Sequence, residues 1–368
     1  MNWGLRIRGL GVAVATLLLV AACGSTGSSG TASCNAKTAT SAADCGGMSA
    51  LVTAAKAEGQ LNVIALPPDW ANYGAVISGF TAKYGIKVNS ANPNGSSQEE
   101  IAAFDGTSRA PDVVDVTQAV ALKNTALFAP YQVSTWKDIL ASEKEATGLW
   151  VEDYGGYMSI GYDPSKVPAV TSVSDLLGSG FKSKVALSGN PTISGQGLNG
   201  VIMAAVANGG SLNDVSKGVD FFHQLKQAGN YVNVIATAAT VKAGQTPVIF
   251  QWDYLSTSHG KDIPGWKIFV PSNAIIGGFY NQAINKAAPH PAAARLWEEY
   301  LYSDEGQNLW LKGGARPVRQ QAMTTAGTVD ATAAAALPAV SGTPQVPTGD
   351  QSTAAFAYLN AHWSAAIS

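Results

Sequence analysis

Two short segments of the sequence repeat one combination of side chains, a carboxylate beside aromatic rings. The residues are Asp69, Trp70 and Tyr73 in the first segment, and Trp252, Asp253 and Tyr254 in the second. A carboxylate can pair with an ammonium group while aromatic faces attract the same cation, which adds about 0.5–2 kcal/mol. The pattern therefore predicts contacts to a ligand that carries an amine. The alternative is structural, with the tryptophans in the core and the aspartates as helix caps.

Two other segments combine serine, glycine and amide side chains just before predicted helices. Free backbone N–H groups at a helix start, together with hydroxyl groups, favour an anion. The candidate contacts are Ser96 and Ser97 in one segment, Ser194, Gly195 and Gln196 in the other, and Gln118 at the end of a predicted strand. Ordinary helix capping is the alternative role. If both kinds of segment contact the ligand, the ligand carries an amine and an acidic group. If only the carboxylate–aromatic segments contact it, a polyamine is favoured.

The sequence lacks the local motifs of common enzyme classes. It has no G-x-S-x-G elbow before a helix, no H-E-x-x-H and no phosphate-binding G-x-x-x-x-G-K segment. None of the four histidines has another histidine or a cysteine at ligand spacing, so we expect no metal site and no cofactor. A secreted hydrolase that uses two carboxylates is the alternative class, because paired acids need no local motif.

Composition sets the remaining limits. The 368 residues are enough for two domains of ordinary size. Lysine and arginine number 23 against 25 aspartates and glutamates, and no basic patch indicates a nucleic-acid partner. We expect a monomer.

The N-terminus has the features of a lipoprotein signal peptide. Arg6 and Arg8 precede an apolar run at residues 10–22, which is shorter than the roughly 20 residues that span a bilayer. The run ends in VAACG, which resembles the bacterial lipobox. The resemblance implies that residues 1–22 are removed and that lipid is attached to Cys23, the first mature residue. Several acyl chains on one cysteine give stable membrane anchoring.

Residues 23–47 are expected to form a flexible tether after the lipid, because the segment begins with a serine- and glycine-rich stretch. Cys34 and Cys45 lie in this segment. A disulfide between them is possible in a secreted protein. We expect it to lie outside the folded core.

The rest of the sequence alternates between strand and helix patterns. Strand patterns at residues 61–66, 86–90 and 111–116 are separated by apolar residues at helical spacing. This order predicts a parallel, doubly wound sheet. Two longer alternating segments, at residues 154–163 and 277–285, flank a second unit of short strands and helices. They are therefore predicted to cross between two lobes.

Several segments together resemble the extracellular solute-binding proteins of ABC importers. Residues 288–296 read APHPAAARL and residues 302–307 read YSDEGQ, which is similar to a signature near the C-terminus of that family. Residues 184–195, KVALSGNPTISG, look like the second-lobe strand and ligand loop of the family. The order of these segments, over roughly residues 50–320, carries the resemblance.

The resemblance implies an α/β, two-lobed periplasmic-binding-protein-like fold of type II, with a doubly wound, mostly parallel sheet in each lobe and two hinge strands. It assigns residues 48–155 and 284–368 to lobe 1, and residues 156–283 to lobe 2. It also implies a protein that is not an enzyme and that is tethered to the outer face of the cell membrane. The two lobes would close on a small solute, which an ABC permease then transports. Among polyamine, aminophosphonate, thiamine and ferric-iron binders, a polyamine-like solute is expected. Iron binders of this family typically present adjacent tyrosines, and no Tyr-Tyr pair occurs here, so the resemblance disfavours iron.

Overall fold

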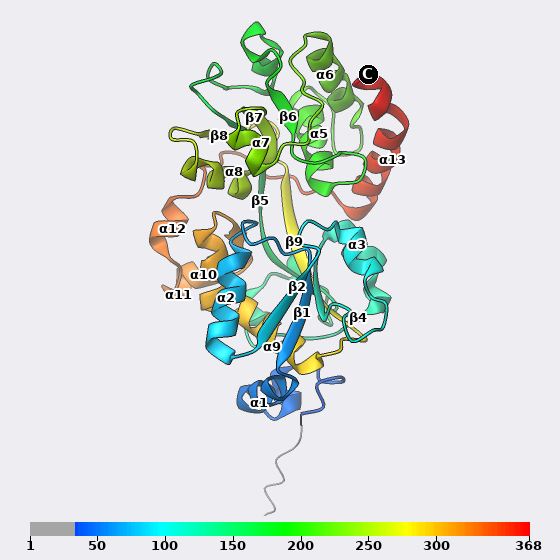
Figure 1. The fold of residues 1–368 in the computed structure, drawn as a ribbon, viewed down its shortest axis with the longest axis vertical. Helices are drawn as coiled ribbons and strands as arrows, with labels where there is room; N and C mark the ends of the chain where they lie inside the picture. The colour runs from blue at the N-terminus through cyan, green and yellow to red at the C-terminus, as the bar shows by residue number, and fades with distance from the viewer. Residues whose placement is uncertain (1–33) are drawn as a thin grey trace, which may run out of the picture. The chain divides into compact units, whose positions relative to one another are not determined.

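The structure is a computed structural model that describes residues 34–368 (Figure 1). The predicted signal peptide and Cys23 lie outside the described residues. The strands are β1 (Gln60–Ile64), β2 (Lys87–Ala91), β3 (Val113–Thr117), β4 (Phe128–Ala129), β5 (Val151–Tyr162), β6 (Val185–Leu187), β7 (Val248–Trp252), β8 (Lys267–Phe269), β9 (Gly277–Asn285) and β10 (Arg316–Pro317). The helices are α1 (Met48–Glu58), α2 (Tyr73–Tyr84), α3 (Ser97–Ala102), α4 (Gln118–Lys123), α5 (Gly195–Ala207), α6 (Ser216–Gln227), α7 (Ala238–Lys242), α8 (Asp253–Ser258), α9 (Pro291–Leu301), α10 (Asp304–Lys312), α11 (Gln320–Ala326), α12 (Ala331–Ala335) and α13 (Gly349–Ala366). Within residues 34–368, no helix combines the length and the apolar character needed to cross a membrane.

Two long strands, β5 and β9, run side by side through the middle of the fold (Figure 1). β3 and β4 pair with β9, while β7 and β8 pair with β5, and β6 lies beyond β7. Helices α1, α2 and α9 surround one end of the long strands, and α5, α6 and α7 surround the other end (Figure 1). The predicted two-lobed α/β fold with two connecting strands is confirmed.

The sheet is mixed and not mostly parallel as predicted. β1 pairs parallel with β2, and β6 pairs parallel with β7, so each lobe keeps one parallel pair. The two long strands run antiparallel to each other and to the neighbours β3, β4, β7 and β8. Because β5 and β9 pass through both lobes and pair with most of the other strands, most pairings in the sheet are antiparallel.

Glycines occur where β5 and β9 cross between the lobes because the chains approach closely there. A Cβ atom on Gly155 would lie 2.4 Å from the Gly278 carbonyl oxygen, and one on Gly278 would lie 2.4 Å from the Trp252 ring. The role of these glycines is to admit close packing.

The segment before α1 belongs to the folded body from Cys34 onward. Cys34 and Cys45 form a disulfide, and Cys45 is fully buried in the main core. The Arg295 guanidinium, itself buried, donates a hydrogen bond of 2.7 Å from Nε to the Ala39 carbonyl. The expected tether therefore does not extend to residue 47, and the disulfide does not lie outside the core. Sequence patterns missed this packing because Arg295 is 256 residues away.

Helix α13 departs from the lobe assignment made from the sequence. That assignment placed residues 284–368 in lobe 1, but α13 packs against α6 and α5 of the second lobe as well as against α4 of the first. Trp363 is buried against Phe222, with ring centroids 5.3 Å apart. The N-terminal end of α13 lies against α4. Gly349 is so close to this helix that a Cβ atom on it would lie 3.0 Å from the Leu122 side chain. α13 therefore contacts both lobes.

Candidate functional site

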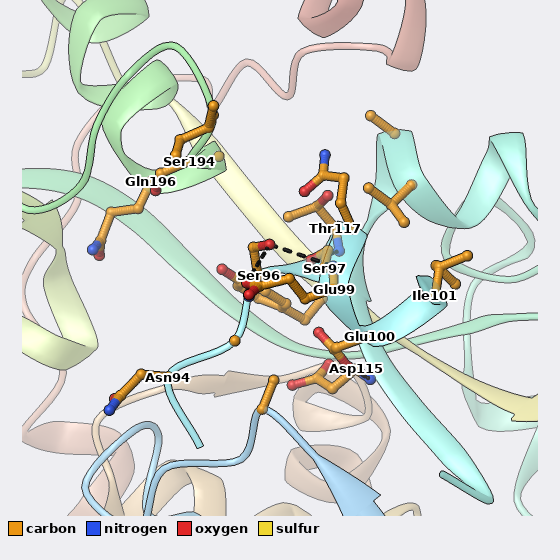
Figure 2. Close-up of a pocket in the computed structure, with 18 of the residues that line it drawn as sticks. Asn94, Ser96, Ser97, Glu99, Glu100, Ile101, Asp115, Thr117, Ser194 and Gln196 are labelled. Atoms are coloured by element: carbon orange, nitrogen blue, oxygen red, sulfur yellow. Dashed lines mark hydrogen bonds between the residues drawn. The ribbon is translucent and has the colours of Figure 1, made fainter. Parts of the chain in front are cut away.

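A cavity of about 690 Å³ lies between segments of the two lobes. Lobe 1 contributes the loop after β1, residues 93–101 at the start of α3, the end of β3, and α4. Lobe 2 contributes the start of α5, while β9 and α13 complete the wall. Figure 2 shows Ser194 and Gln196 on one side of this space and Ser96 and Ser97 on the other. A volume of this size is typical of small-molecule sites.

The carboxyl ends of buried strands position the lobe 1 side of the cavity. Both faces of β1 are covered: Leu61 and Val63 pack in the main core, and Ile64 packs in another cluster with Val114 and Val116 of β3. The polar residues that follow these strands collect at one edge, where open α/β sheets bind ligands.

The residue directly after β1 has a strained backbone conformation. Ala65 lines the cavity with φ of 56°, in the left-handed region that alanine rarely adopts. Such a conformation costs on the order of 1–3 kcal/mol and occurs preferentially at binding sites. Here it turns the chain at the point where β1 ends and the loop toward Trp70 begins.

The predicted serine and glycine contacts lie at the cavity. Two of the serines, Ser96 and Ser194, also cap helices. Ser96 caps α3 by accepting from the Glu99 amide, and Ser194 caps α5 by accepting from the Gly197 amide. Ser97 Oγ accepts from the Thr117 amide at 3.1 Å. The capping role therefore accounts for the interactions of both cap hydroxyls in this structure. Contact with a solute stays a prediction for all of them.

Gly195 lies where the two lobes touch. A Cβ atom at this position would lie 3.2 Å from the Thr117 methyl group on β3, so a larger side chain would press against lobe 1. Gln196 is buried beside Gly195 and lines the same cavity.

The cavity wall contains three acidic residues that the sequence patterns did not single out, Glu99, Glu100 and Asp115. Asp115 Oδ2 accepts from the Tyr73 hydroxyl at 2.7 Å and from the Tyr154 hydroxyl at 3.0 Å. Glu100 Oε2 accepts from the Asp115 amide at 2.9 Å, and the two residues lie next to each other in Figure 2. Asp115 Oδ1 is buried and has no hydrogen-bond partner among residues 34–368. This oxygen therefore has an unused acceptor position, on a residue that lines the cavity.

These carboxyl groups lie in an acidic environment and have no ion-pair partner among the described residues. Burial raises the pKa of Asp115 to about 7, although the Tyr73 and Tyr154 hydroxyls act in the opposite direction. Burial, and then the Asp115 charge, raise the pKa of Glu100 and of nearby Asp153. In the described part of the chain, no lysine, arginine or histidine forms an ion pair with any of the three. A cationic ligand group would favour their charged forms.

Trp70 and Tyr280 provide aromatic surface in the same cavity. Their ring centroids are 5.8 Å apart and nearly perpendicular. Trp70 Nε1 donates to the Tyr154 hydroxyl at 2.8 Å, which links the ring to the Asp115 network. Tyr73 and Tyr254 are fully buried behind this wall, so neither lines the cavity.

The two predicted carboxylate contacts, Asp69 and Asp253, do not line the cavity. Asp69 is exposed to solvent. Asp253 is fully buried and forms an ion pair with Arg316, and it accepts from the Tyr157 and Tyr254 amides, each at 3.0 Å. The structure therefore does not place these two aspartates on opposite sides of a solute amine. The cationic partner of Asp253 is supplied by the chain itself.

Asp253→Asn is expected to destabilise the fold by about 3–5 kcal/mol, because it leaves the largely buried Arg316 charge without its anionic partner. Urea unfolding measures this loss. Asp69→Asn is the matched control and is expected to change stability by less than about 0.5 kcal/mol, because its side chain is exposed. If Asp253→Asn unfolds like the parent protein and loses solute affinity, Asp253 is a ligand contact after all.

The other two predicted contacts, Gln118 and Trp252, line a smaller pocket of about 60 Å³ that shares a wall with the main cavity. Among residues 34–368 there is no group of three or more histidine, cysteine, aspartate or glutamate side chains arranged to hold a metal ion.

The comparisons with known proteins decide the family. A family model described as bacterial extracellular solute-binding protein matches residues 111–336. The chain belongs to this family. The matched residues include both segments of the C-terminal signature and the predicted ligand loop at residues 184–195. No match was found among curated proteins.

Solved structures of solute-binding proteins share the fold. A candidate spermidine/putrescine ABC transporter protein from Listeria monocytogenes is 12% identical, with a TM-score of 0.63 over 83% of this chain and 99% of its own. The ferric binding protein from Campylobacter jejuni is 16% identical, with a TM-score of 0.61 over 83% and 99%. AfuA from Actinobacillus pleuropneumoniae, with fructose-6-phosphate bound, is 15% identical, with a TM-score of 0.62 over 83% and 99%.

These similarities establish a type II periplasmic-binding-protein fold for this solute-binding protein. Proteins of this kind serve ABC transporters: they bind small solutes outside the cytoplasm and work with a membrane permease. The three similar structures are named for chemically different solutes, so the solute has to be inferred from the cavity.

Proposed function

We propose that this solute-binding protein captures a small polar solute with an amine group, of polyamine-like chemistry, for an ABC importer. The observation that carries the proposal is the buried, unpartnered Asp115 Oδ1 at the cavity. An ammonium group placed there would balance the negative charge of Asp115 and Glu100. Its methylene groups would lie against Trp70 and Tyr280, where cation–π attraction adds about 0.5–2 kcal/mol. Asp115 and Glu100 take the role that the sequence assigned to Asp69 and Asp253.

A thermal-shift panel tests this proposal with putrescine, spermidine, 2-aminoethylphosphonate, thiamine and ferric citrate. A solute at 100 times its dissociation constant adds about 2.7 kcal/mol of stability to the protein, which such a scan detects. We expect putrescine or spermidine to give the largest shift. Stabilisation by ferric citrate alone would contradict the proposal.

An aminophosphonate is the second candidate, because the same cavity contains a cation. Lys123 lines it together with the serine-rich starts of α3 and α5, and Lys123 forms no ion pair among the described residues. An acidic group could bind there while the amine binds at Asp115. A larger shift with 2-aminoethylphosphonate than with putrescine would favour this solute.

We further propose that the lobes close on the solute by bending of β5 and β9, and that the protein acts as a monomer that leaves the solute chemically unchanged. Gly195 of lobe 2 already lies close to Thr117 of lobe 1 in this structure. Small-angle scattering is expected to show a smaller radius of gyration after the solute is added. An unchanged radius would indicate a rigid binder.

The proposed lipid anchor is tested by Cys23→Ala. We expect this variant to lose lipid and to be released from the membrane or left uncleaved, because the lipid on Cys23 is the proposed attachment. Metabolic labelling with a palmitate analogue measures the change. Persistent labelling of the alanine variant would contradict lipid attachment at Cys23.

A further inference from the structure

A side pocket of about 60 Å³ lies next to the main cavity. The two spaces share a wall made by Thr117, Ala119, Gly195, Tyr280 and Phe356. A space of about 10–15 Å³ on this measure holds one water molecule, so the side pocket has room for a small polar group. A terminal amine with its adjoining carbon fits in such a space.

The side pocket is lined by polar atoms that are not satisfied by the protein. Gln118 Oε1, Asn199 Oδ1 and Trp252 Nε1 are buried there without a hydrogen-bond partner in the described part of the chain. Buried polar atoms usually have partners, and leaving one unpaired costs about 1–3 kcal/mol. The two amide oxygens are acceptors and are available to an N–H donor of a solute, whereas Trp252 Nε1 is a donor and cannot pair with an ammonium group.

The side pocket contains a carboxyl group that a cation would ionise. Glu152, on β5, lines the pocket and forms no ion pair among residues 34–368. Burial, and then the charge of Glu143, raise the pKa of Glu152 to about 8. Two amide oxygens and one carboxyl group are acceptors, which match the N–H donors of an ammonium group.

Part of the side pocket is built by a segment that the family model does not match. That model ends at residue 336, whereas Val346, Ser352 and Phe356 belong to α13 and the residues just before it. Phe356 lines both the main cavity and the side pocket. The pocket is therefore partly a property of the C-terminal segment of this chain.

We propose that the side pocket is a second subsite, which holds the far ammonium group of a solute with two amines, with Glu152, Gln118 and Asn199 as acceptors. This inference rests on the proposed amine-binding function. The first ammonium group binds at Asp115, and the chain between the two groups passes the shared wall at Tyr280 and Phe356.

Calorimetric titration with putrescine and butylamine tests the subsite, because the two compounds share a four-carbon chain and differ in the second amine. The parent protein is expected to bind putrescine at least tenfold more tightly than butylamine. Glu152→Gln and, separately, Gln118→Ala are expected to remove most of this difference by weakening putrescine. Asp220→Asn is the matched control for loss of a carboxylate, since Asp220 is exposed and lines neither pocket, and it should keep the preference.

The outcomes separate the subsite from the proposed function. Equal affinities of the parent protein for both compounds would overturn the subsite and leave amine binding in place. Loss of putrescine and butylamine binding to the same extent in Glu152→Gln would also overturn it. Binding of neither compound by the parent protein would overturn both the subsite and the amine proposal.

Discussion

Asp115→Asn is expected to lower solute affinity by about 30-fold to several thousand-fold, which corresponds to about 2–5 kcal/mol. The substitution removes the charge that an ammonium group would meet in a buried site. An Asn oxygen can still accept from the Tyr73 and Tyr154 hydroxyls, so the local hydrogen bonds can be kept. Calorimetric titration of the empty protein with the solute found in the panel measures the affinity.

The stability of the same variant distinguishes binding from folding. The pKa of Asp115 in the folded, empty protein is raised to about 7, so the folded state holds a proton that the unfolded state has released. Its contribution to stability therefore falls as pH rises from about 4 to about 7. Asp115→Asn should lack this fall and be at least as stable as the parent at pH 8. A variant that binds within threefold of the parent would rule out Asp115 as the amine contact.

Solute affinity is expected to rise about 50-fold between pH 5 and pH 7 and only about twofold more at higher pH. An ammonium group binds best to ionised Asp115, whose pKa in the empty site is about 7. Below that pKa, binding must release one proton, which changes affinity about tenfold per pH unit. Amines of the panel stay protonated over this range, so the carboxyl group sets the slope.

The acidic neighbours of Asp115 decide how steep this dependence becomes. Glu100 and Asp153 carry raised pKa values, and the Tyr73 and Tyr154 hydroxyls face the same carboxyl group. Calorimetry in buffers of different ionisation enthalpy counts the protons released, and at least one is expected at pH 6. An affinity independent of pH, with no proton release, would contradict binding of a cation at this cluster.

Patterns within short segments predicted much of the fold. The alternating sequence of residues 277–285 gave the bounds of β9 correctly, because strict alternation over a long run is typical of a strand. The family signature ends in Glu305, Gly306 and Gln307, on α10, where Gln307 is fully buried. Those residues pack the body of lobe 1, and they indicate the fold better than the ligand.

The site was harder to predict because its chemistry depends on distant partners. Asp253 directly follows the buried strand β7 and Asp115 lies within the buried strand β3, and nothing local in the sequence shows which of the two is already paired. The partner of Asp253, Arg316, is 63 residues away. The sequence patterns favour Gln118, three residues after Asp115. Asp115 differs from Asp253 in being buried without an ion-pair partner among residues 34–368, which only the folded structure shows. A raised pKa arises from the folded environment and leaves no pattern in the sequence.

A crystal structure with the solute from the panel tests the central claim most directly. We expect an amine nitrogen within about 2.7–3.2 Å of Asp115 Oδ1. The bound molecule should be chemically identical to the one added, as mass spectrometry of the dissolved crystals can show. A solute bound with its amine away from Asp115 and Glu100, or recovered as a cleaved product, would contradict the account.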